Sequence, residues 1–343
     1  MPQQELELGL TPGSRNYRAF VGYPAKYDII AAMQFNLLTF LGLRQHHRLL
    51  DLGCGSLRAG RLFIPYLNKD HYCGIEPEEW LVREGIERET GQDLIRIKNP
   101  SFAYRADYKL TCFGIRFDFI LAQSIFSHAG AHDIQRCLAE AAATLAPGGL
   151  LVASFVLDRE DYAGDAWVYP TCVGYKDSTV RRIAATAGLD FLVIDWPHPN
   201  GQTWAVFWLC DKRQAPTDPT YAYQKPAFEK PAPQWVHADT GAGFFDGVWD
   251  VGEAWLAYGW ARDIHRKAPA EFVIVAADAK IVASGPAGLE RPDVASAYGA
   301  EFLLSGFRIR IPKPDCPPGN NLCCYAYHPP TEQVLVLSGA HSV

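Results

Sequence analysis

The sequence predicts an α/β fold, a doubly wound seven-stranded sheet with an antiparallel edge strand, followed by an all-β sandwich domain. Short apolar runs alternate with helical patterns up to residue 212, which is typical of parallel strands joined by helices. The last two runs of this region follow each other without a helix, as in a hairpin at a sheet edge. Further along, short strand patterns recur without helices, as in a β-sandwich.

Composition shifts divide the chain of 343 residues into four parts. Residues 1–24 are polar and rich in glycine and proline, so we expect an arm that becomes ordered by packing on the body. Residues 25–212 carry the α/β pattern, residues 213–234 are a proline-rich linker, and residues 235–343 form the sandwich. Two domains suit this length, because single cores stop growing near ~250–300 residues.

Charge and composition exclude several classes of partner. The net charge of −6 argues against nucleic acid, because the chain offers no basic stripe for the phosphate backbone. No apolar run approaches the ~18 residues of a membrane span, and the first ten residues lack a secretion signal. Nine scattered cysteines indicate reduced thiols of a cytoplasmic protein, and without Asp/His clustering we expect no metal.

The first half of the α/β region begins with a helix over residues 25–42, whose apolar residues recur at helical spacing. The strand 48–52 then runs into the glycine loop, and Pro65 should end the short helix that follows. Strands are predicted further along at 71–75, 102–104, 117–122, 150–156, 191–195 and 203–209. Helices are predicted after Pro77 up to Gly91, from Asp133 to Pro147, and from Ser178 to Gly188. In the sandwich, strands are predicted at 255–261, 271–276, 281–283, 302–311, 323–327 and 333–337.

The loop after the first strand reads LLDLGCGSLRAG over residues 49–60. Its glycines permit a tight turn and a close approach of ligand to the main chain. The unpaired amides of the following helix can bind an anion. Arg58 stands where a dinucleotide-binding loop has its third glycine, which disfavours a nicotinamide oxidoreductase. No Gly-Lys-Ser/Thr occurs, so a phosphate-binding loop of that type is excluded.

The segment DLGCGSLRAG resembles the first motif of class I S-adenosylmethionine-dependent methyltransferases. Three further signals follow in the order of that family: Glu76 after the second strand, Asp107 ten residues before FDFILA, and LAPGG before the fifth strand. The resemblance implies a Rossmann-like fold, S-adenosylmethionine as cofactor, and contact of Asp107 with the adenine amino group. The expected cofactor-binding residues are Asp51, Gly53, Cys54, Gly55, Arg58, Glu76, Asp107, Gln123 and Ser124.

Each of these side chains has a simpler interpretation. The spacing of Glu76 from the glycine loop matches an acid that binds ribose hydroxyls, but it can also be an exposed loop acid. Asp51 can stabilise the loop through its amides without touching ligand. Arg58 can bind the cofactor carboxylate or hold the N-terminal arm. Gln123 and Ser124 can line the crevice or satisfy the end of their strand.

For a hydroxyl acceptor, methyl transfer needs alignment and a base that titrates near neutrality. His128 follows the fourth strand, where the acceptor should lie, and is the expected base; alternatively it caps the next helix or bonds locally. Trp167, Tyr169 and His198 lie on loops that should flank a saccharide or other small-molecule acceptor. The alternative for Trp167 and Tyr169 is burial beneath their loops.

The leading hypothesis is O-methylation of a sugar or surface-polysaccharide intermediate. The phrases GWARD, GLERPDVASAYG and SGFRIRIP of the carboxyl-terminal domain resemble a β-sandwich module of bacterial surface-polysaccharide enzymes. One alternative is a methyltransferase of another small molecule or of a protein, and a second is a non-catalytic scaffold that keeps the fold. The sequence gives no oligomeric state. A cofactor crevice filled by the protein's own side chains, or Glu76 pointing away from it, would argue against an enzyme.

Overall fold

The computed structural model describes residues 8–210, 235–236, 241–264, 266–278, 280–328 and 333–343. Two compact units divide the chain, one of them comprising Met1–Leu157, Asp161–Tyr175 and Thr179–Ala222, and the other the remainder. The proline-rich linker predicted over residues 213–234 lies outside the described residues.

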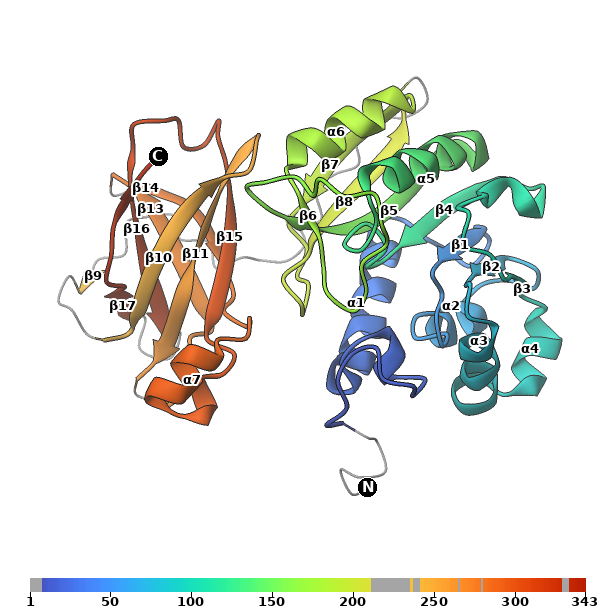
Figure 1. The fold of residues 1–343 in the computed structure, drawn as a ribbon, viewed down its shortest axis with the longest axis horizontal. Helices are drawn as coiled ribbons and strands as arrows, with labels where there is room; N and C mark the ends of the chain where they lie inside the picture. Colours follow the sequence, from blue (N-terminus) through green and yellow to red (C-terminus); the bar gives the residue numbers. More distant parts are fainter. Residues whose placement is uncertain (1–7, 211–234, 237–240, 265, 279, 329–332) are drawn as a thin grey trace. The chain divides into compact units, whose positions relative to one another are not determined.

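The first unit is built on one mixed sheet (Figure 1) with the strand order β3-β2-β1-β4-β5-β8-β7, and β6 pairs with β5. Its strands are β1 Leu49–Leu52, β2 Tyr72–Ile75, β3 Ser101–Ala103, β4 Phe117–Ala122, β5 Leu145–Leu157, β6 Gly174–Tyr175, β7 Leu189–Ile194 and β8 Thr203–Leu209. Strands β1 to β5 pair in parallel, whereas β8 is antiparallel to both β5 and β7. The chain reverses its direction of strand addition between β1 and β4, and such a point opens a ligand crevice at the carboxyl ends.

Helices cover both faces of this sheet. Figure 1 shows α5 and α6 on one side and α1, α2 and α3 on the other. The helices are α1 Tyr27–Phe40, α2 Gly60–Tyr66, α3 Glu79–Gly85, α4 Gln92–Lys98, α5 Ala131–Thr144 and α6 Asp177–Thr186, with a π-helix, η3, at Ile86–Thr90 and 3-10 turns at Ala19–Val21, Pro24–Lys26 and Leu110–Phe113. Every residue of β1 and β2 is buried, which fits the continuous apolar runs of parallel strands. The doubly wound α/β prediction is confirmed.

The structure differs from the prediction in some elements of this unit. Helix α4 lies where no helix was predicted, and the predicted helix up to Gly91 is divided between α3 and the π-helix. Strand β5 begins at Leu145, because Leu145 pairs with Phe117; residues 146–149 bulge out of the ladder, which resumes with Leu150 opposite Phe119. The antiparallel strand β8 lies next to the sheet edge, since β7 occupies the edge itself.

The described residues of the second unit form β-strands apart from two short helical segments. One sheet contains β10 Gly243–Asp250, β11 Ala254–Asp263, β12 Ala268–Pro269 and β15 Gly306–Pro312. The other contains β9 Trp235–Val236, β13 Phe272–Ala277, β14 Lys280–Gly285, β16 Asn321–His328, β17 Gln333–Val336 and β18 His341–Ser342. One buried cluster joins Trp255 and Phe307 of the first sheet to Val275 and Cys324 of the second, as in a sandwich. Strand β10 and helix α7 (Pro292–Tyr298) were not predicted.

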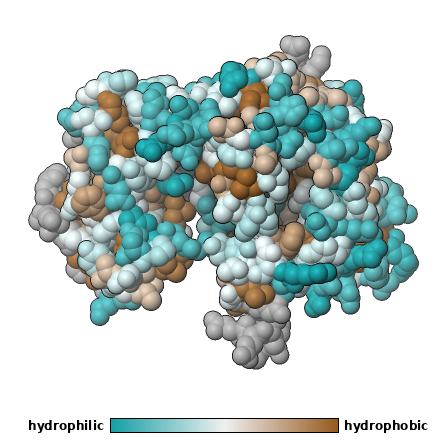
Figure 2. Space-filling view, in the orientation of Figure 1, coloured by the Kyte–Doolittle hydropathy of each residue, from teal (hydrophilic) through white to brown (hydrophobic). Residues whose placement is uncertain are grey.

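The surface has the mixed character of an ordinary globular protein. On the face in Figure 2, hydrophobic residues form small areas separated by hydrophilic ones. None of the helices in the described part of the chain has the length and apolar character that a membrane crossing requires. Within the same residues, no three His, Cys, Asp or Glu side chains gather as a potential metal site.

Candidate active site

The loop after β1 turns sharply at its two glycines. Gly53 and Gly55 have φ angles of 70° and 53°, in the left-handed region that glycine adopts without strain. The amides of Gly53 and Cys54 donate to the main-chain oxygen of Ile75 at 2.8 and 3.1 Å. These two bonds hold the loop at the carboxyl ends of β1 and β2, where the crevice opens.

Glu76 points into this loop. Its Oε2 accepts a hydrogen bond from the amide of Gly55 at 2.9 Å, and its Oε1 accepts one from the amide of Glu78 at 3.0 Å. The residue is 8% exposed. Burial raises the pKa of the Glu76 carboxyl to about 7, although the two amide donors favour its charged form. Glu76 is therefore not an exposed loop acid, and it titrates near neutrality.

Asp51 is the second buried acid of the site. Its Oδ2 accepts a hydrogen bond from the Tyr72 hydroxyl at 2.7 Å, so its partner is a side chain of β2 rather than a loop amide. Burial raises the pKa of Asp51 to about 6, with the Tyr72 bond and the charge of Arg58 acting in the opposite direction. Once ionised, the Asp51 carboxylate can bind a cation or accept a hydrogen bond from a ligand.

Arg58 holds the N-terminal arm, which we define as the described residues 8–23. Its Nη1 donates to the main-chain oxygen of Val21 at 2.7 Å, and its Nη2 donates to Oε1 of Gln123. Arg58 is 9% exposed, and desolvation lowers the pKa of its guanidinium. Arg58 therefore holds the N-terminal arm in place. Its guanidinium has five N–H groups, so others remain that could bind a carboxylate.

A small cavity lies between the loop, helix α1 and the arm. Four of its nine lining residues carry an amide, a carboxyl or a guanidinium. The lining residues are Val21, Gln34, Asp51, Gly53, Cys54, Gly55, Arg58, Ala59 and Gln123. Six of the residues predicted to bind the cofactor are therefore brought together here, and Glu76 adjoins them through Gly55.

A buried polar network continues from this cavity across the ends of β4 and β5. Nε2 of Gln123 donates to the Ser124 hydroxyl at 2.6 Å and lies 3.3 Å from Nε2 of His198. Ser124 exchanges hydrogen bonds with Gln202, and its amide donates to the Ser154 hydroxyl. Ser124 has a φ angle of 56°, an uncommon conformation that clusters at functional sites. Gln123 thus lines the cavity and also bonds to Ser124 at the end of β4.

His128 lies beneath the loop that contains Trp167 and Tyr169. Its Nδ1 is 2.9 Å from the main-chain oxygens of both Val168 and Thr171. Because carbonyl oxygens only accept, Nδ1 carries the hydrogen and Nε2 keeps its lone pair. Burial lowers the pKa of His128, so the neutral form persists below the ordinary histidine range. His128 does not cap α5, whose N-cap is Gly130.

The two loop aromatics pack against this histidine. The Trp167 and Tyr169 rings lie 5.4 and 5.0 Å from the His128 ring. Trp167 is 47% exposed, so the alternative interpretation, burial beneath its loop, does not apply to this residue. Tyr169 is half-buried and its hydroxyl donates to the main-chain oxygen of Phe20. His198 is displaced from this group, in the network of Gln123.

Asp107 is not brought to the cavity. Its carboxylate forms two 2.6 Å hydrogen bonds with the guanidinium of Arg105 and remains half-exposed. The Arg105 bonds hold the pKa of Asp107 well below its usual range. The contact with adenine that the resemblance implied therefore has no support in this geometry.

The donor set fits the polar groups of S-adenosylmethionine. A carboxylate suits Arg58, an ammonium suits Asp51, and ribose hydroxyls suit Glu76. The space above the glycines is narrow, however. A Cβ built on Gly55 would lie 2.7 Å from Cγ1 of Val21, and one on Gly53 would overlap Cδ1 of Ile125. The chemistry of the cavity fits the cofactor, and Val21 of the arm forms part of its wall.

Several residues of the site were not predicted from the sequence. Gln34 is buried in α1 and lines the cavity. Its signal was a lone amide between the apolar positions Ile30 and Leu37, where a helix face should be hydrophobic. No pattern in the sequence marks Val21 or Gln202 as site residues, because only packing between distant segments brings them to the site.

Comparison with known proteins agrees with the predicted activity. Residues 50–151 match a family model described as a methyltransferase domain. The match confirms the predictions of an enzyme of the S-adenosylmethionine-dependent methyltransferase type and of its cofactor.

Solved structures similar to the chain include three whose matches each cover about half of the chain. Magnesium protoporphyrin IX methyltransferase from Synechocystis with bound SAM is 16% identical, with a TM-score of 0.40, over 52% of this chain and 81% of that one. Mitomycin 7-O-methyltransferase MmcR is 14% identical, with a TM-score of 0.44, over 57% and 56%. Streptomyces venezuelae DesVI is 14% identical, with a TM-score of 0.42, over 54% and 92%.

Proposed function

We propose that this methyltransferase acts on a hydroxyl group of a sugar or surface-polysaccharide intermediate. S-adenosylmethionine supplies a methyl group already activated on a sulfonium. The residues of the chain must hold the donor, align the acceptor oxygen with the methyl carbon, and remove the hydroxyl proton. Each task has a group suited to it in the first unit.

The cofactor is held by the three charged groups around the glycine loop. Glu76 would accept hydrogen bonds from the ribose hydroxyls, Arg58 would bind the carboxylate, and Asp51 would bind the ammonium. All three are at least nine-tenths buried, so water competes weakly for these bonds and each is worth more than at the surface. The amides of Gly53 and Gly55 are bonded to the Ile75 oxygen and to Glu76, so they fix the loop rather than bind the ligand.

The observation that carries the proposal is the orientation of the His128 ring. Two carbonyl oxygens fix the hydrogen on Nδ1, so Nε2 is the acceptor for a proton. In the proposed step the acceptor oxygen forms a bond to the methyl carbon while the carbon–sulfur bond breaks. The hydroxyl proton passes to Nε2 of His128, and S-adenosylhomocysteine leaves with the electron pair of the broken bond.

The acceptor class is inferred from one side chain beside His128 and from two others at the strand ends. Trp167 offers an exposed indole face, and His198 and Gln123 offer polar groups at the strand ends. An aromatic face with a few placed polar groups suits a sugar ring, which is apolar on one face and rich in hydroxyls. The carboxyl-terminal β-sandwich, which resembles modules of surface-polysaccharide enzymes, supports the same class.

The proposal is tested by incubating the full chain with methyl-labelled S-adenosylmethionine and a panel of nucleotide sugars, glycans, phenols and peptides. We expect label in a saccharide product as a methyl ether that survives mild alkali. Label only in phenols or peptides would favour a methyltransferase of another class. Cofactor binding by calorimetry without turnover on any acceptor would favour the non-catalytic scaffold.

A further inference from the structure

We propose that the N-terminal arm is a movable wall of the cofactor site, latched by Glu89, which opens to admit the cofactor and closes over it. This inference rests on the proposed cofactor binding and goes beyond it, because it assigns a role to residues outside the glycine motif. Three sets of contacts support it: one to the glycine loop, one to the acceptor side, and one at the base of the arm.

The arm closes the site above Gly55. Val21 lines the cavity and its Cγ1 occupies the place that a side chain on residue 55 would fill. Its main-chain oxygen accepts the hydrogen bond from Arg58 at 2.7 Å. A ligand that enters the cavity beside Gly55 must pass Val21, which is part of its lining, so we expect entry to require that Val21 withdraw.

The same arm reaches the acceptor side through Phe20. The Phe20 ring packs against Trp80, four residues after Glu76, with ring centroids 5.3 Å apart, and against Tyr169 at 5.9 Å. The Tyr169 hydroxyl also donates to the main-chain oxygen of Phe20. Movement of the arm therefore changes the support of Tyr169, which packs on His128, so closure over cofactor orders the acceptor loop.

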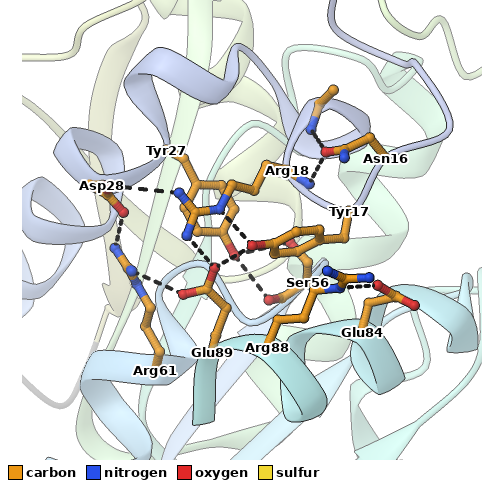
Figure 3. Close-up of polar contacts among 11 residues, drawn as sticks. Asn16, Tyr17, Arg18, Tyr27, Asp28, Ser56, Arg61, Glu84, Arg88 and Glu89 are labelled. Carbon is orange, nitrogen blue, oxygen red and sulfur yellow. Dashed lines mark hydrogen bonds and ion pairs between the residues drawn. The ribbon is translucent and has the colours of Figure 1, made fainter. Parts of the chain in front are cut away.

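Glu89 holds the base of the arm (Figure 3). Its carboxylate accepts hydrogen bonds from Arg18 Nη2 at 2.7 Å, from the Tyr17 hydroxyl at 3.0 Å, and from Arg61 Nη1 at 3.0 Å. Arg61 belongs to α2, directly after the glycine loop, and also pairs with Asp28 of α1. The Glu89 side chain is 5% exposed, so this carboxylate joins the arm to both elements in a poorly solvated place.

Helix α1 ties the same cluster to the loop. The Tyr27 hydroxyl donates to the main-chain oxygen of Ser56 at 3.0 Å, and the Arg18 guanidinium lies over the Tyr27 ring, 4.7 Å from its centre. Glu89 itself stands in the π-helix Ile86–Thr90, a form that is frequent at functional sites. The latch thus lies directly beside the loop that it would control.

Because the latch is held by charge-assisted bonds, neutralising Glu89 should free the arm without touching the cofactor groups. The test uses the full-length Glu89→Gln variant, with Glu87→Gln as the matched control, since Glu87 is an exposed acid of the same π-helix. Stopped-flow fluorescence measures S-adenosylmethionine association and dissociation. We expect both rate constants to rise in Glu89→Gln, dissociation by roughly tenfold, and to stay at wild-type values in Glu87→Gln.

Trypsin cleavage after Arg15 and Arg18 gives a readout independent of activity. Cleavage should be faster in Glu89→Gln than in wild type, and S-adenosylhomocysteine should slow it in both proteins. If Glu89→Gln does not fold, Tyr17→Phe removes one of the three donors and should show the same changes at smaller size. If the folded variant has the same cofactor association and dissociation rates and the same trypsin cleavage rate as wild type, the proposal of a movable arm is wrong, while the proposed function is unaffected. Failure of the wild type to bind S-adenosylmethionine by calorimetry would overturn the proposed function as well.

Discussion

Glu76 and Gly55 are joined across the mouth of β1 and β2 by a hydrogen bond of 2.9 Å, with the Gly55 amide donating to the carboxylate. This contact brings the acid after the second strand to the loop after the first. A ribose placed at the loop would therefore meet an oxygen acceptor already oriented by the main chain.

Replacing Glu76 by Gln should weaken S-adenosylmethionine binding by about 10- to 100-fold. The charged acceptor of the ribose hydroxyls is lost, and a hydrogen bond to a charged group is worth about 1.5–3 kcal/mol. Isothermal titration calorimetry measures the change. Glu79→Gln is the control, because Glu79 is an exposed acid paired with Arg83, and it should bind as wild type does.

Cofactor affinity should rise with pH through about 7. The pKa of Glu76 is raised to about 7, so the carboxylate that accepts the ribose hydroxyls forms only as pH passes this value. Calorimetry between pH 6 and 8, in buffers of different ionisation enthalpy, should show proton release on binding near pH 6.5. The pH slope should be absent in Glu76→Gln, and an equal slope in that variant would assign it to another group.

The stability of the protein should depend on the same carboxyl with the opposite sign. The pKa of Glu76 is raised above 4.5 in the folded protein. Between pH 4.5 and 7, Glu76 therefore stays protonated in the native state, whereas it is ionised in the unfolded chain. The contribution of Glu76 to the free energy of unfolding is therefore full below pH 4.5 and is lost by pH 7, a change of about 2–3 kcal/mol. Urea unfolding of wild type and Glu76→Gln at pH 5 and 7.5 measures the difference.

Replacing His128 by Ala should lower kcat by roughly 10²- to 10⁴-fold, the contribution of a general base, with S-adenosylmethionine affinity unchanged. The pKa of His128 is lowered, so the acid limb of kcat/KM in the wild type should lie below pH 6.5. His132→Ala alters an exposed histidine of α5 and should leave kcat intact. A wild-type kcat in His128→Ala would show that His128 is not the base and that it only holds the loop through its bonds to the main-chain oxygens.

Gly53→Ala should destabilise the protein more than Gly91→Ala. The two glycines have similar φ angles, 70° and 76°, so both variants carry backbone strain of about 1 kcal/mol. Only at residue 53 does the new Cβ overlap Ile125, whereas the space at residue 91 is open. Chemical denaturation gives the difference, and the addition of Ile125→Ala to Gly53→Ala should reduce it. An equal loss of stability in the two variants would show that the Ile125 side chain moves aside at little cost.

The local part of this fold could be predicted from the sequence, and the packed part could not. The glycine turn and Glu76 follow from patterns within a few residues, because an apolar strand and a turn are set by their own side chains. Strand β5 begins five residues before the prediction, because Leu145 pairs with Phe117, a residue distant in sequence. The turn predicted at Ala146 to Gly149 is present as a bulge within this strand.

The candidate site divides in the same way. The cavity residues of the motif came together as predicted, whereas Asp107, assigned by resemblance, pairs with Arg105 instead. Val21 could not be found, because its place over Gly55 depends on contacts between distant segments. The sequence shows which groups can act on a ligand, but long-range contacts determine which of them meet.

The position of Val21 and Phe20 has a consequence for inhibitor selectivity. Compounds that mimic only the nucleoside would bind the glycine loop and Glu76, which are features of the motif itself and are shared by other enzymes that carry it. A compound extended toward Phe20 and Trp80 would instead use a surface supplied by residues that the motif does not specify. Discrimination between two targets is a difference of affinities, so the amino-terminal segment is the part of this chain against which a selective ligand should be built.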